Sequence, residues 1–193
     1  AAFNDFALPY FIDRRVAVSH HPMIEFVNAS IRAVINNFPT SQMLAWLKTG
    51  LCDVNVEQIY ELENYCLAFG IEGSDWLMTK WNFAGSESGF DEEQINTIKD
   101  SAVKPLIEFQ KLLKADCPGH TIAAGEFTTA IWQLLEKFNI ADKLSAQDDG
   151  NNENGQLYEK FTAVFDELYF VFGQQKMPIE QIAGIVSNAF SKM

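Results

Sequence analysis

The fold is decided by the stretch DEEQINTIKDSAVKPLIEFQKLL at residues 91–113. Its apolar residues recur at steps of three and four, a spacing that predicts an amphipathic helix with one buried face. Asp91 is a residue type that caps helix N-termini. Pro105 removes one helical hydrogen bond and crowds the carbonyl of Ser101, so the sequence predicts a kink there. The predicted core stripe consists of Ile95, Ile98, Ala102, Leu106, Phe109 and Leu113.

The same apolar spacing recurs on both sides of this segment. It predicts helices over residues 22–38, 40–50, 55–70, 127–138, 157–173 and 178–190. In the helix over 157–173 the predicted core stripe is Leu157, Phe161, Val164, Leu168 and Val171. The predicted fold class is therefore all-α, an irregular multi-helix bundle.

Residue types at the ends of these segments support the helix boundaries. Thr40 is predicted to cap the second helix, and Asn55 with Gln58 three residues later resembles a capping box. Gly70 is expected to end the third helix in a left-handed conformation.

Two stretches interrupt the helical pattern. Residues 71–90 hold Trp76, Trp81 and Phe83 among Gly and Ser. These rings could stack on nucleic-acid bases, but without accompanying positive charge we expect them in the core or at a domain interface. Residues 145–156 carry no apolar side chain larger than Ala and are predicted to form a flexible acidic surface loop.

An extended segment precedes the first helix. The run LPYFID at residues 8–13 is typical of a short strand, and a lone strand needs a partner that this helical sequence does not supply. We therefore expect residues 1–18 to belong to a neighbouring domain and residues 19–193 to form a helical accessory domain. The chain, which begins at Ala1 and not at Met, is expected to be an excised piece of a longer protein.

Composition narrows the functional class. The chain has 193 residues, 48% of them hydrophobic, which suits one globular domain or two very small ones. Its 14 Lys and Arg against 26 Asp and Glu give a net charge of -12, which disfavours nucleic-acid and membrane-surface binding by this chain alone. It has no long apolar run and no secretory signal, so a soluble, cytoplasmic protein is expected. The spacing of Cys52, Cys66 and Cys117 indicates buried reduced thiols.

The search for catalytic motifs is negative. No phosphate-binding loop, nucleophile motif, zinc motif or di-iron motif is present, so no catalytic, cofactor or metal residue is predicted. His20 and His21 follow Arg14 and Arg15 closely. Adjacent side chains on a helix diverge by about 100°, so a shared metal is disfavoured. Capping of the helix start and contact with a nucleic acid or a neighbouring domain both stay open. The acidic runs at 61–63 and 91–93 are expected on solvated helix faces or first turns.

Several of these stretches carry a family resemblance. The runs LPYFID at 8–13 and SHHPMIEFV at 19–27 resemble the B-type subunits of bacterial ATP-dependent helicase/deoxyribonucleases, the AddB/RexB family. The runs LKTGL at 47–51 and LENYCLAFGI at 62–71 are similar to further blocks of that family, as are Gly73, Trp76 and Trp81. The specific part covers residues 8–81, while residues 91–193 share only the general helical pattern. Cys66 and Phe69 depart from the expected side chains and keep the apolar character.

The resemblance implies an internal piece of a superfamily-1-like helicase chain. In such a chain residues 8–13 would be a strand of the second motor-like domain, and the helical block would resemble the inserted 2B subdomain. The parent would act with an A-type helicase/nuclease partner in resecting broken DNA ends. Its ATP and Mg site would precede residue 1, and its nuclease with an iron–sulfur cluster would follow residue 193. Arg14, Arg15, His20 and His21 are the residues expected nearest to DNA.

A second interpretation is a free-standing all-α interaction domain that binds a protein partner in an exposed aromatic groove around Trp76 and Trp81. A helical-bundle enzyme without a recognisable motif is a third. The complete reading frame distinguishes the first two, because the helicase interpretation requires a phosphate-loop motif upstream and a Cys-rich segment downstream.

Overall fold

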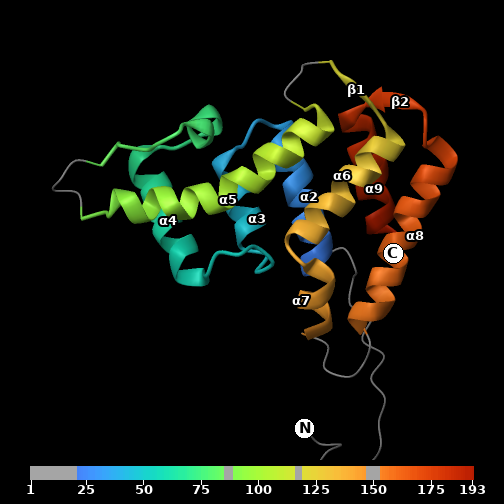
Figure 1. Cartoon of the computed structure of the whole chain (residues 1–193), viewed down its shortest axis with the longest axis horizontal. Coiled ribbons are helices and arrows are strands. Elements are labelled where there is room, and N and C mark those ends of the chain that lie inside the picture. The colour runs from blue at the N-terminus through green and yellow to red at the C-terminus, as the bar shows by residue number, and fades with distance from the viewer. Residues whose placement is uncertain (1–20, 85–88, 116–118, 147–152) are drawn as a thin grey trace, which may run out of the picture.

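The chain forms a bundle of α-helices, as predicted (Figure 1). The computed structural model describes residues 21–84, 89–115, 119–146 and 153–193. Its elements are α2 (Pro22–Ile35), α3 (Thr40–Leu47), α4 (Val56–Phe69), the 3-10 helix η2 (Gly73–Leu77), α5 (Glu92–Leu113), β1 (Thr121–Ala123), α6 (Ala124–Lys137), α7 (Ile140–Ala146), α8 (Glu153–Phe172), β2 (Lys176–Pro178) and α9 (Ile179–Ser191). No helix in these ranges is long and apolar enough to cross a membrane.

Helix α5 links the two ends of the molecule. It packs against α4 at one end, against α2 along its middle and against α6 at the other end, with α8 and α9 beyond α6 (Figure 1). All six residues of its predicted core stripe are buried. Pro105 lies inside the helix, which continues without a break to Leu113. The stripe thus joins the halves of the bundle into one core.

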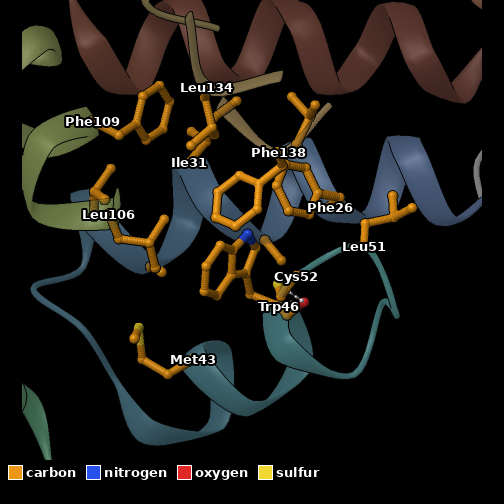
Figure 2. Packing of buried hydrophobic residues seen from close by; sticks show 14 of the residues in the cluster. Phe26, Ile31, Met43, Trp46, Leu51, Cys52, Leu106, Phe109, Leu134 and Phe138 are labelled. Carbon is orange, nitrogen blue, oxygen red and sulfur yellow. Dashed lines mark hydrogen bonds between the residues drawn. The ribbon is translucent and has the colours of Figure 1, made fainter. Parts of the chain in front are cut away.

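Aromatic packing fills the centre of that core (Figure 2). The rings of Phe26, Trp46 and Phe138 lie with their centroids 5.4–5.7 Å apart, in tilted and edge-on contacts. The Cys52 thiol donates a hydrogen bond to the Trp46 carbonyl. Burial raises the pKa of Cys52, and it raises that of Cys66 to about 12. The prediction of buried thiols is confirmed for these two, while Cys117 lies outside the described residues.

The predicted helix ends are mostly confirmed. Asn55 and Gln58 form a reciprocal capping box, Asp91 accepts hydrogen bonds from the first turn of α5, and Gly70 has a φ of 64°. The prediction for Thr40 is wrong, because Pro39 is the N-cap and Thr40 is the first residue of α3. The Thr40 hydroxyl is engaged elsewhere, as described below.

The sequence did not predict the two-stranded sheet or α7. In the sheet, β1 pairs antiparallel with β2, with Ile122 opposite Met177, and both side chains are buried. Each strand has three residues and leads directly into a helix, which is too short for a periodic signal. The pairing joins the start of α6 to the start of α9.

Two further expectations are corrected by the structure, and the N-terminal ones lie outside the described residues. The predicted loop over 145–156 is too long at both ends, because α7 runs to Ala146 and α8 begins at Glu153. Val171 is 56% exposed, so its assignment to the core stripe is wrong. The predicted strand at 8–13 and the domain boundary after residue 18 lie outside the described residues.

Candidate functional site

Of the predicted contact residues, the described structure contains only His21. Its half-buried ring caps α2, because Nδ1 accepts a hydrogen bond of 3.2 Å from the Met23 amide. Nε2 lies 3.0 Å from Oδ1 of Asn154, in the first turn of α8. With Nδ1 as acceptor, Nε2 carries the proton and donates to Asn154. The ring therefore ties the start of α2 to the start of α8.

The other predicted contact residues, Arg14, Arg15 and His20, lie outside the described residues. Both ring nitrogens of His21 are occupied by the contacts above. Across the four described ranges, no three His, Cys, Asp or Glu side chains come together as metal ligands would.

The acidic runs at 61–63 and 91–93 make contacts that join parts of the bundle. Asp91 caps α5, and Oε1 of Glu92 accepts hydrogen bonds from the Tyr65 hydroxyl and the Ala84 amide. Glu61 accepts from Gln94, and Glu63 pairs with Lys48 across α3 and α4. These contacts agree with the expected first-turn and surface roles.

We call residues 71–84, which follow α4, the aromatic loop. This loop is folded inward. Trp76 and Trp81 are both fully buried, with their ring centroids 5.1 Å apart and edge-on, and Trp81 stacks on Tyr65. The prediction that they lie in the core is confirmed, whereas Phe83 is 39% exposed. The exposed aromatic groove of the alternative interpretation is therefore wrong, because neither tryptophan is accessible to a partner.

One set of polar contacts holds this loop to α3. The Thr40 hydroxyl donates to the Ile71 carbonyl and accepts a 2.8 Å hydrogen bond from Nε1 of Trp76. The carboxylate of Glu72 accepts from the Thr40 amide at 3.2 Å. The buried indole and a free amide at the start of α3 are thus both satisfied.

A second set of polar contacts holds the loop to α5. Lys99 is 1% exposed, and its ammonium group donates to the carbonyls of Met78 at 2.7 Å and Thr79 at 3.1 Å. It also lies 3.2 Å from the Asp100 carboxylate and 5.6 Å from the centre of the Trp81 ring. Partial burial alone would raise the pKa of Asp100, but hydrogen bonds from Lys104 and Lys99 lower it.

The amide side chain of Asn96 completes this attachment. It accepts a hydrogen bond of 2.7 Å from the Trp81 amide and donates one of 2.9 Å to the Trp81 carbonyl. The sequence did not predict that Thr40, Asn96 and Lys99 bind the loop. A lysine within the apolar stripe of a helix is the signal that could have drawn attention to Lys99.

The chain is similar over its whole length to proteins named as the B subunit of an ATP-dependent helicase/deoxyribonuclease. The protein from Moorella thermoacetica is 30% identical over 99% of this chain, and that from Acetivibrio thermocellus is 30% identical over all of it. The protein from Natranaerobius thermophilus is 28% identical, also over the whole chain. The resemblance to the AddB/RexB family is confirmed.

The similarity covers a limited part of each relative. This chain spans 18–19% of the length of these AddB/RexB-type proteins, about a fifth. No family model matches the chain. The names of these relatives describe the activity of much longer proteins.

Proposed function

We propose that this chain is a non-catalytic helical scaffold within the B-type subunit of a bacterial ATP-dependent helicase/deoxyribonuclease. It supports the DNA channel and the subunit interface of an enzyme that resects broken DNA ends for recombinational repair. The observation that carries the proposal is the alignment of all, or nearly all, of this chain with a fifth of each AddB/RexB-type relative.

The use of polar side chains supports a scaffold. The buried ammonium group of Lys99, the hydroxyl of Thr40 and the amide of Asn96 all bond to backbone groups or to a buried ring. Glu92 is likewise bonded to Tyr65 and to the Ala84 amide. Groups held in this way position the loop after α4 and have few free atoms for a substrate.

In this proposal the reactive chemistry belongs to other parts of the parent chain. ATP and Mg would bind before residue 1, and an iron–sulfur cluster would bind after residue 193. The word "subunit" in the relatives' names supports a partner, which we propose to be an A-type helicase/nuclease chain. Residues 1–18 would form part of the neighbouring motor-like domain, and the helical block would correspond to a 2B-like insertion.

The scaffold role is tested in the complete complex of both subunits. We expect Glu57→Gln and Glu167→Gln, which change exposed carboxylates, to leave ATP hydrolysis and nuclease rates within twofold of wild type. Lys99→Met, which removes one of the attachments of the loop, should reduce the amount of DNA unwound per ATP hydrolysed. A loss of a hundredfold or more in either chemical rate from an exposed carboxylate variant would refute a non-catalytic role.

The proposed DNA-proximal residues are tested together. Replacing Arg14, Arg15, His20 and His21 with Ala in the complete complex should weaken DNA binding and make it less dependent on salt, because two fixed positive charges are lost. Unchanged DNA affinity and unchanged resection would remove these residues from the DNA path. His21→Asn is the control, since Asn also caps helices.

A further inference from the structure

The last turn of α8 presents a cluster of large apolar side chains to solvent. Tyr169 is 55% exposed, Phe170 is 90% exposed and Val171 is 56% exposed. We call these three consecutive residues the α8 patch. Consecutive helical side chains diverge by about 100°, so the three together expose apolar surface around roughly half of this turn. Single exposed apolar residues are ordinary on protein surfaces, whereas larger exposed apolar surfaces mark contact sites.

An apolar groove continues the α8 patch toward α9. It has a volume of about 600 Å³ and runs between the two helices, with Glu167 and Lys192 at its sides. Val171 belongs to both the patch and the groove. The groove is lined by Val164, Leu168, Val171, Phe172, Ile185 and Ala189. A protein segment that covers the patch could therefore also place a side chain in the groove.

The patch is held in a fixed position. The Gly173 amide donates to the Tyr169 carbonyl at 2.8 Å, and the Gly173 carbonyl accepts from the Gly125 amide at 2.9 Å. A methyl group added at Gly125 would lie 3.0 Å from the Tyr169 ring. Because α6 supports the turn so closely, the backbone of the patch and the Tyr169 ring are held in place before anything binds, which reduces the entropy cost of association.

Two observations indicate which protein segment covers the α8 patch. The chain is about a fifth of the length of its relatives, so about four fifths of such a polypeptide lies outside it. The hydrogen bond from His21 to Asn154 places His21, which directly precedes α2, beside the first turn of α8. The patch lies 16 residues further along α8, about 24 Å at 1.5 Å per residue. Polypeptide joined to His21 therefore starts about 24 Å from the patch along α8, a distance that a domain of about 100 residues can span.

We propose that the α8 patch and its groove are the surface on which another domain of the same AddB/RexB-type polypeptide packs. This rests on the proposed function only in that the chain is part of a longer polypeptide. Leu112 is 44% exposed and is the only exposed large apolar side chain of α5. An isolated exposed apolar residue is ordinary on a protein surface, so Leu112 provides an internal comparison.

Hydroxyl-radical labelling, which reports the solvent exposure of side chains, tests the proposal. It is applied to this 193-residue chain, whose described residues share one core, and to the full-length parent polypeptide without its partner. We expect labelling of Tyr169 and Phe170 to fall at least fivefold in the full-length protein, and that of Leu112 to stay within twofold. Equal labelling of the patch in both proteins would overturn the proposal. So would protection that requires the added A-type partner, or protection of the 193-residue chain that rises with its concentration.

A pair of variants gives an independent measurement. Phe170→Ser should leave the Tm of the 193-residue chain within 1–2 °C of wild type, since the ring is exposed there, and lower that of the full-length parent polypeptide by several degrees. Leu112→Ser is the control and should change the Tm of both proteins by the same small amount. An equal response of both proteins to Phe170→Ser would contradict an interdomain contact. Failure of the scaffold proposal would alter DNA processing without changing these two results.

Discussion

Removing the Thr40 hydroxyl tests how the aromatic loop is held. Thr40→Val keeps the shape of the side chain but takes away the donor to the Ile71 carbonyl and the acceptor for the Trp76 indole N–H. Both partners are left in a nearly water-free site, because Ile71 is 3% exposed and Trp76 is fully buried. An unsatisfied buried polar group costs roughly 1–3 kcal/mol. We expect the free energy of unfolding to fall by about 2–4 kcal/mol.

Urea unfolding followed by tryptophan fluorescence measures this change. The midpoint should shift to lower urea with little change in the slope, since the surface exposed on unfolding is similar. Thr97→Val is the matched control, because the exposed Thr97 hydroxyl bonds only to a carbonyl of its own helix. That variant should stay within about 0.5 kcal/mol of wild type.

A double-mutant cycle separates the two lost contacts. Trp76→Phe removes the indole donor, so Thr40→Val made in that background leaves only the Ile71 carbonyl unpaired. The cost of Thr40→Val should therefore be about 1 kcal/mol smaller there than in wild type. A Thr40→Val protein within 0.5 kcal/mol of wild type, or two strictly additive changes, would refute the account of how the loop is held.

Three further predictions concern other buried or capping groups. Lys99→Met should lower the free energy of unfolding by about 2–4 kcal/mol, because it leaves two carbonyls unpaired. Lys104→Met is the control, since it removes the exposed partner of the same Asp100, and it should cost under about 0.5 kcal/mol in the same urea titration. The folded pKa of Cys66 is raised from 9.0 to about 12, so wild type should lose stability as the pH rises above 9. Cys66→Ala should reduce this loss between pH 8 and 10 by about 1.4 kcal/mol. Unfolding titrations at the two pH values would detect the difference. His21→Ala should cost about 1 kcal/mol through loss of the α2 cap, whereas His21→Asn should retain most of the stability, and equal losses would contradict a capping role.

The helices could be predicted because their signals are local. The buried stripe of α5 and the caps at Asp91 and Asn55 depend on residues a few positions apart, and all were confirmed. The pairing of β1 with β2 could not be predicted in this way, since it joins residues 121–123 to 176–178 through backbone groups of any sequence. Its stability comes from helices that meet only in the folded chain.

The contacts of the candidate site could likewise be predicted only where they are local in sequence. The sequence drew attention to His21 and offered a cap as one of its roles, but its second partner, Asn154, is 133 residues away. Thr40 was identified as a helix-capping residue from its neighbours in sequence, yet its hydroxyl serves groups 31 and 36 residues away. Hydroxyl and amide side chains have many possible partners, so spacing alone does not select among them.

At Val171 the apolar periodicity of α8 no longer predicts which side chains are buried. It follows Leu168 at helical spacing, and Leu168 is 4% exposed whereas Val171 is 56% exposed. The backbone continues as a helix to Phe172, and the described chain leaves Val171 and Phe170 largely exposed. A stripe selected for burial over its whole length should be covered over its whole length in the complete protein. The mismatch between periodicity and exposure therefore supports an interdomain contact at the α8 patch, because an apolar spacing meant only for the core of this block would have ended at Leu168.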